Sequence, residues 1–128
     1  MTYMSDGSGS TDGSPRDQLA TYYDLIDAGD VDGLLSLFAD DVRYERPGRE
    51  TIEGIDALRT FYERERPLED GSHEISHIVV EGAHAAVRGE FSGRLDGDPV
   101  SFGFADYHEF DEDGLITNRY TYTDRDAV

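Results

Sequence analysis

The chain has 128 residues, a formal net charge of −18 at neutral pH and no cysteine. This length suits a single domain, and the absence of cysteine excludes disulfides and thiolate metal sites. A surface this negative repels phosphate backbones, and no apolar run reaches the length of a membrane helix, so we expect neither a nucleic-acid nor a membrane partner. The N-terminal region has no basic segment followed by an apolar one, so we expect no secretory signal and a cytoplasmic location.

The eleven basic residues are all arginine, against 29 acidic residues. Abundant aspartate without lysine is typical of proteins from salt-accumulating archaea, and an ordinary acidic protein is the alternative. The two interpretations differ in the effect of salt. Self-repulsion among so many negative charges destabilises a compact fold, and salt screens that repulsion.

Residues 1–14 are mostly serine, glycine, threonine and aspartate, a composition that predicts a disordered acidic tail. A single folded domain is predicted over 15–125. Its first helix begins at Pro15, with Ser14 as a cap, and stops at Gly29. Four residues at helical spacing form its apolar face: Leu19, Tyr22, Tyr23 and Ile26.

Two further helices and a short strand are predicted before Pro67. Asp30 caps a second helix, and Gly54 leads into a third. The strand covers 42–46 and ends at a Pro-Gly pair. The apolar residues of the two helices are Leu34, Leu37 and Phe38 in the second, and Ile55, Leu58, Phe61 and Tyr62 in the third.

After Pro67 the apolar period changes from helical to alternating, which predicts strands at about 73–80, 84–94, 100–111 and 115–123. The pairs Glu81-Gly82, Asp96-Gly97 and Asp113-Gly114 lie between them, as hairpin turns prefer. Helices followed by an antiparallel meander predict an α+β fold, with the helices on one face of a curled sheet.

The strand predicted over 100–111 carries the strongest indication of a site. Its even-numbered residues share one face, and this face is aromatic except for Asp106 and His108. An aspartate among three phenylalanines is costly to bury unless it is hydrogen-bonded or paired. The full set on this face is Phe102, Phe104, Asp106, His108 and Phe110.

Several segments together resemble the nuclear transport factor 2-like superfamily, in its SnoaL-like polyketide cyclase and ketosteroid isomerase branches. They are 22–30 (YYDLIDAGD), 37–42 (LFADDV), Gly54, Phe61-Tyr62, 110–116 (FDEDGLI), Arg119 and Tyr122. The resemblance implies a cone made of a strongly bent antiparallel sheet and three N-terminal helices. It also implies a pocket for a small hydrophobic or carboxylate-bearing molecule, no cofactor, and a homodimer formed through the outer sheet face.

The resemblance also implies roles for individual residues. The oxyanion-hole tyrosine and aspartic acid of ketosteroid isomerase fall on Tyr22 and Asp106, and the tyrosine that supports the first falls on Tyr62. The general-base aspartate falls on Arg46, and an arginine cannot abstract a proton at neutral pH. The isomerase mechanism therefore lacks its central residue in this chain.

One pocket is expected to hold the candidate site residues. Tyr22, Asp106 and His108 are the candidate catalytic set, with the first two holding a substrate oxygen and His108 acting as a base near neutral pH. Arg46 or Arg119 is expected to hold a carboxylate, or to pair with Asp106 for stability alone. The remaining candidate ligand-binding residues are Tyr44, Tyr62, Phe91 and Phe104.

Other features indicate less. His73 and His77 lack a third inward ligand, so we expect no metal and an exposed or interface role for both. The catalytic positions of limonene epoxide hydrolase, a relative on the same fold, fall on Val87, Gly89 and Thr121, which disfavours that activity. Three hypotheses remain: a cofactor-free isomerase, cyclase or dehydratase acting next to a carbonyl, a binding domain for a small anion, or a dimeric interaction module.

Overall fold

A computed structural model describes residues 15–124 of the chain. The predicted tail over 1–14 and the last residue of the predicted domain lie outside the described residues. In the described part, no helix is long and apolar enough to cross a membrane.

Helices and strands follow one another much as the sequence predicts. The order is α1 (Pro15–Ala28), α2 (Val31–Leu35), β1 (Phe38–Glu45), β2 (Ile52–Glu53), α3 (Ile55–Thr60), the π-helical turn η1 (Phe61–Glu65), β3 (Leu68–Glu81), β4 (His84–Leu95), β5 (Asp98–Phe110) and β6 (Ile116–Thr123). The predicted α+β class is therefore confirmed.

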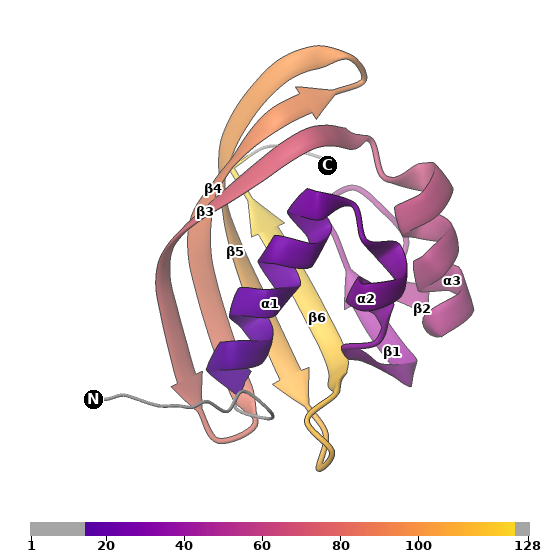
Figure 1. Cartoon of the computed structure of the whole chain (residues 1–128), viewed down its shortest axis with the longest axis vertical. Helices are drawn as coiled ribbons and strands as arrows, with labels where there is room; N and C mark the ends of the chain where they lie inside the picture. The colour runs from indigo at the N-terminus through magenta and orange to yellow at the C-terminus, as the bar shows by residue number, and fades with distance from the viewer. Residues whose placement is uncertain (1–14, 125–128) are drawn as a thin grey trace.

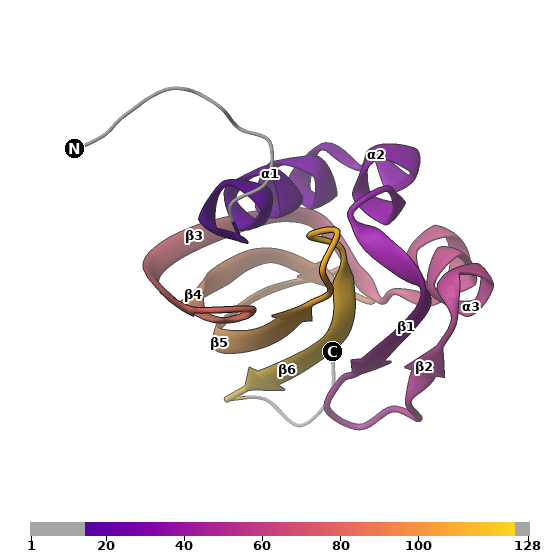
Figure 2. The ribbon, with the colours of Figure 1, turned by 90° about the horizontal axis from the view of Figure 1, so that it is seen from below.

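The six strands form one sheet in the order β2-β1-β6-β5-β4-β3. Its pairs are antiparallel except for β1 and β6, which run parallel, so the sheet is mixed rather than purely antiparallel. Figures 1 and 2 show the long strands curling around α1, with α2 and α3 beside it on the same concave side. The result is an open cone whose core lies between the helices and the concave face.

Capping chemistry explains the first two helices. Gly29 takes a φ of +73°, a conformation that suits glycine, and ends α1. The Asp30 side chain then accepts a hydrogen bond of 3.0 Å from the Gly33 amide and caps α2. The second helix is shorter than predicted, because Phe38 already belongs to β1 and pairs with Ile116 of β6.

The third helix does not stay α-helical. After Thr60 the chain widens into η1, and the Arg66 amide donates to the Phe61 carbonyl five residues earlier, at 2.8 Å. Such π-helical turns often occur at functional sites. Pro67 follows, and β3 starts at Leu68, five residues before the predicted position.

Two register shifts in β3 explain why its start was missed. They lie between Glu69 and Ser72 and between Ile75 and His77, where the alternation of inward and outward side chains is interrupted. Gly71 lies in the first shift, and a side chain there would collide with the Phe91 ring. The early part of β3 therefore packs closely on β4 and forms one wall of the cone's mouth.

Candidate functional site

The predicted alternation of β5 is confirmed. All five even-numbered residues from Phe102 to Phe110 are buried, and none of the odd-numbered ones between them is. The strand stays in register with β4 along its whole length, which keeps the alternation unbroken. Asp106 and His108 thus lie inside the molecule, in the layer between the sheet and α1.

Asp106 is the centre of a hydrogen-bonded cluster and is 2% exposed. One carboxylate oxygen accepts from the Tyr23 hydroxyl at 2.6 Å and from the Arg119 guanidinium at 2.8 Å. The other oxygen accepts from the Thr121 hydroxyl at 2.6 Å. Burial alone raises the pKa of Asp106, but Arg119 and these hydrogen bonds outweigh it and lower the pKa to about 2. The carboxylate is ionised near neutral pH and its oxygens already have partners.

Arg119, rather than Arg46, is the partner of Asp106. Its side chain is 4% exposed, and its guanidinium also donates to the Tyr62 hydroxyl at 3.2 Å. The guanidinium carbon lies 4.5 Å from the ring centroids of both Tyr22 and Tyr44. Aromatic rings at this distance stabilise a buried cation by their quadrupoles. Arg119 is therefore held in one position by a carboxylate, a hydroxyl and two rings.

Tyr23, rather than Tyr22, contacts Asp106. The Tyr22 hydroxyl instead shares a hydrogen bond of 2.8 Å with the Tyr62 hydroxyl. The two neighbouring tyrosines both lie on the buried face of α1, so helical periodicity does not distinguish them. Tyr22 and Asp106 thus each have protein partners here, and their joint binding of a substrate oxygen stays a prediction.

A second branch of the cluster runs from Thr121 to Arg46. The Tyr44 hydroxyl lies 2.7 Å from the Thr121 hydroxyl, and the Arg46 guanidinium donates to the Tyr44 hydroxyl. The Arg46 guanidinium also lies over the Phe61 ring, 4.8 Å from its centroid. Thr121 connects the two branches. In the sequence analysis it appears only as a residue that disfavours epoxide-hydrolase activity. The feature of the sequence that indicates a role for Thr121 is its position two residues after Arg119 on one strand, which places both side chains on the same face.

His108 is sealed in the core. It is 0% exposed and packs against the Tyr22 and Phe110 rings, with centroid distances of 5.9 and 6.3 Å. Within residues 15–124, neither ring nitrogen has a hydrogen-bond partner. Burial, together with Arg119, lowers the pKa of His108 to about 3. The imidazole is therefore neutral at physiological pH and lies in a fully packed region.

A small cavity of about 20 Å³ lies beside Asp106, enough for one water molecule. Of the predicted site residues, it is lined by Arg46, Phe91, Phe104, Asp106 and Arg119. Tyr22, Tyr44, Tyr62 and His108 do not line it. The complete lining is Ile26, Arg46, Arg66, Leu68, His73, Phe91, Phe102, Phe104, Asp106, Arg119, Thr121 and Thr123.

His73 reaches the same cavity, contrary to its expected exposed role. Its side chain is 9% exposed, pairs with Asp27 and packs on the rings of Phe91 and Phe104. Burial lowers the pKa of His73, and the bond to Asp27 opposes that shift. In the part of the chain described, no three His, Asp or Glu side chains gather as a metal site requires.

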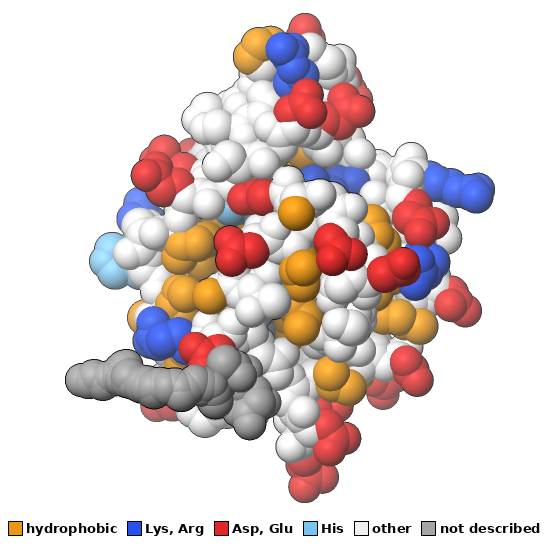
Figure 3. All heavy atoms as spheres, in the orientation of Figure 1, with side chains coloured by type: hydrophobic (Ala, Val, Ile, Leu, Met, Phe, Trp, Pro, Cys, Tyr) orange, Lys and Arg blue, Asp and Glu red, His pale blue; other side chains and the backbone are white. Residues whose placement is uncertain are grey.

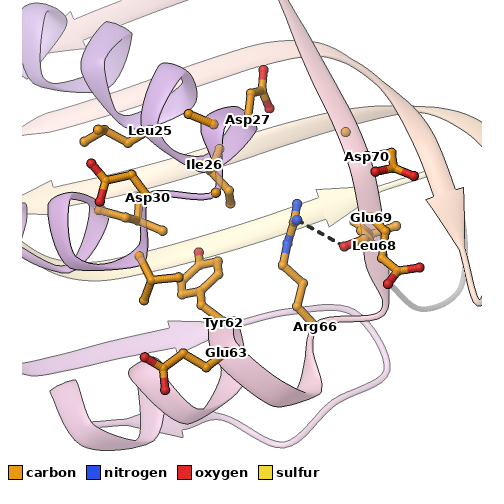
Figure 4. Close-up of a pocket in the computed structure, with 15 residues that line it drawn as sticks. Leu25, Ile26, Asp27, Asp30, Tyr62, Glu63, Arg66, Leu68, Glu69 and Asp70 are labelled. Atoms are coloured by element: carbon orange, nitrogen blue, oxygen red, sulfur yellow. Dashed lines mark hydrogen bonds between the residues drawn. The ribbon is translucent and has the colours of Figure 1, made fainter.

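A larger groove of about 410 Å³ lies next to the cavity, between the end of α1, η1 and the start of β3 (Figure 4). Ile26, Arg66 and Leu68 line both spaces and separate them. Tyr62 reaches the groove with its half-buried ring. The groove falls in the size range of small-molecule sites, whereas the cavity does not.

A bent six-stranded sheet that wraps an aromatic core beneath N-terminal helices is the nuclear transport factor 2-like fold. Within that fold the chain belongs to the SnoaL-like domain family, whose model matches residues 19–119. The predicted resemblance to SnoaL-like proteins is thereby confirmed.

Solved structures share this fold. A protein of unknown function from Exiguobacterium is 27% identical, with a TM-score of 0.73 over 84% of this chain and 98% of that one. A candidate polyketide cyclase from Sinorhizobium meliloti is 25% identical, with a TM-score of 0.67 over 83% and 94%. An LEH-like epoxide hydrolase from M. tuberculosis is 22% identical, with a TM-score of 0.75 over 86% and 82%.

The positions that the resemblance assigns to the catalytic residues of limonene epoxide hydrolase hold other residue types in this chain. A side chain at Gly89 would collide with the Glu74 carbonyl and the Phe104 ring. Thr121, at another of the catalytic positions, is bonded to Asp106. The similarity to that neighbour therefore concerns the fold alone.

Proposed function

We propose that the chain binds a small organic anion with an apolar body at the mouth of its cone, where the small cavity and the groove share Ile26, Arg66 and Leu68. The observation that carries this proposal is the charge of the cavity lining, which contains Arg46, Arg66 and Arg119 but a single carboxylate, Asp106. In a chain with 29 acidic and eleven basic residues, such a concentration of arginine is unexpected for a merely solvated surface.

The physical reason is charge compensation. Asp106 compensates Arg119, since the two are in direct contact at 2.8 Å. Arg66 forms no ion pair among the described residues, and a charge removed from water is costly without a counterion. A ligand carboxylate or similar oxyanion supplies that counterion, and arginine binds such groups with two parallel hydrogen bonds.

The rest of the lining favours an apolar ligand body. Phe91, Phe102 and Phe104 form the inner wall, and Ile26 and Leu68 face the groove. Aromatic and aliphatic walls around a few polar groups are typical of small-molecule sites. A simple inorganic anion would leave the apolar side chains that line the groove, such as Ile26 and Leu68, without a ligand contact, so the proposal is an organic anion.

A reaction next to a carbonyl is the second candidate, and Tyr62 is the observation in its favour. Its hydroxyl accepts from Arg119 and pairs with Tyr22, which favours donation toward a substrate oxygen in the groove. The residues considered as bases argue against it. Asp106 has a pKa of about 2, His108 is sealed, and Arg46 takes the place of the isomerase base. Binding without turnover is therefore the better-supported function.

The test is calorimetric titration of the protein with three ligands of one chain length: octanoate, octanol and octylamine. Octanoate is expected to bind, and the neutral and cationic analogues to bind at least about tenfold more weakly, because they cannot compensate an arginine. Equal affinity for all three, or no affinity for octanoate, would refute an anion site.

A further inference from the structure

Arg66 is an unusual arginine for this chain. Its Nε is buried and, among the described residues, has no hydrogen-bond partner. One terminal nitrogen donates to the Leu68 carbonyl at a long 3.4 Å, and the guanidinium lies 5.8 Å from the Phe91 ring centroid. No described carboxylate is within ion-pair distance of it. Burial lowers the pKa of Arg66, as expected for a cation without a counterion.

This lack of a counterion is not due to a lack of carboxylates. Five acidic residues line the same groove: Asp27, Asp30, Glu63, Glu69 and Asp70. Figure 4 shows Arg66 reaching from the end of η1 into the space between Ile26 and Leu68, with the acidic side chains spaced around the groove. The guanidinium therefore points to the junction of groove and cavity instead of pairing with a neighbouring acid.

The backbone holds Arg66 at this junction. Its amide closes the π-helical turn by donating to the Phe61 carbonyl at 2.8 Å, and Pro67 fixes the chain direction immediately after it. An α-helical turn at this point would rotate the side chain to a different face of the helix. The π turn thus directs the guanidinium toward the groove.

We propose that Arg66 anchors the carboxylate of a ligand whose body lies in the groove, and that the site selects singly charged carboxylates. This inference rests on the proposed function and gives the anion a binding residue and a place. The cavity holds only about 20 Å³, so an organic ligand fits outside it, in the 410 Å³ groove.

The groove also sets the specificity. Its apolar residues, Ile26, Val31, Leu34 and Leu68, offer a surface for an alkyl or aryl body. The acidic side chains around the groove repel a second negative charge at the far end of the ligand. A monocarboxylate therefore satisfies Arg66 without penalty, whereas a dicarboxylate of the same length places one carboxylate among five others.

The experiment compares wild-type protein with Arg66→Met and with the matched control Arg64→Met. Arg64 is an exposed arginine of the same π-helical turn and does not line the groove. Octanoate and octanedioate are the probes, calorimetry gives their affinities, and thermal unfolding is measured with and without octanoate. Amide NMR shifts locate bound octanoate.

Wild-type protein and Arg64→Met are expected to bind octanoate equally, with shifts at Ile26, Val31 and Leu68, and octanedioate more weakly. Arg66→Met should lose about tenfold or more in octanoate affinity, since a charge-assisted pair is removed. Without ligand, its unfolding temperature should equal or exceed that of wild type, because an uncompensated cation is replaced by an apolar side chain of similar shape.

Each contrary outcome has its own meaning. Octanoate binding that survives in Arg66→Met, or shifts confined to the cone around Phe104, would overturn the role of Arg66 while leaving an anion site in place. Equal affinity for octanedioate would overturn the selectivity. A clear loss of stability in unliganded Arg66→Met would show that the residue is structural. Absence of octanoate binding by wild type would instead refute the proposed function itself.

Discussion

At the scale of single residues, His108 is a titratable group that is fully buried and has no polar partner among the described residues. Its pKa of about 3 is lower than the value of about 6.5 of an unfolded chain, so the unfolded state binds a proton first as the pH falls. The stabilising effect of the neutral imidazole is complete above about pH 6.5 and is lost progressively toward pH 3. The loss amounts to about 1.4 kcal/mol per pH unit.

We predict that His108→Leu removes this acid sensitivity. The substitution keeps the volume of the side chain and leaves the neighbouring rings of Tyr22 and Phe110 in apolar contact. Urea unfolding between pH 7.5 and 4.5 should show equal or higher stability at pH 7.5 and a smaller decrease on acidification than in wild type.

Two comparisons make this prediction specific. His77→Leu changes an exposed histidine on β3 and is the matched control for the substitution itself. Asp106 also loses stabilising free energy on acidification, but only below its unfolded pKa of about 3.8, which is outside the tested range. His73, whose pKa burial also lowers, contributes to the pH dependence that remains in His108→Leu. An unchanged slope in His108→Leu would contradict the assignment.

At the scale of elements, β5 and β3 show what sequence patterns can and cannot predict. β5 keeps its register with β4 throughout, so simple alternation placed Asp106 and His108 inside correctly. β3 has two register shifts, which alternation cannot represent, and so the inward position of His73 was missed. Arg66 was missed for a related reason, since nothing in 63–66 distinguishes a π-helical turn from a solvated helix end.

The convex face of the sheet carries another prediction at this scale. Val79, Ala86, Tyr107 and Tyr120 lie in one row across four strands, and Tyr122 is on the same face. Val79 and Tyr122 are exposed large hydrophobic residues, at 64% and 61%. We propose that this row is the homodimer interface that the family resemblance implies, because apolar side chains gather on it in an otherwise acidic protein.

Light scattering after size exclusion tests this interface. Wild type is expected to have twice the chain mass of 14.3 kDa, and Tyr122→Glu to have the mass of one chain, since two like charges would meet at a symmetric contact. Ala57→Glu, on the exposed side of α3, is the matched control and should stay dimeric. A monomeric wild type, or a dimeric Tyr122→Glu, would exclude the convex face as proposed.

At the scale of the whole molecule, the charge pattern separates an acidic exterior from an arginine-lined interior. Figure 3 shows acidic side chains spread over one face of the molecule with few basic ones beside them. The ion pairs seen at the surface, such as Arg59 with Asp32 and Glu63, compensate little of a net charge of −18. The folded state therefore brings like charges closer than the unfolded chain does.

We predict that salt stabilises the fold. Screening shortens the range of repulsion from about 10 Å at 0.1 M salt to about 3 Å at 1 M, so the unfolding temperature should rise steeply over this range in KCl. The Asp106–Arg119 pair is buried and is screened far less, so the core should not weaken in return. Glu112→Gln with Asp113→Asn, at the exposed β5–β6 turn, should raise the unfolding temperature in dilute buffer but not in 2 M KCl. Equal unfolding temperatures of wild type in dilute buffer and in 2 M KCl would show instead that the chain tolerates its charge as an ordinary acidic protein does.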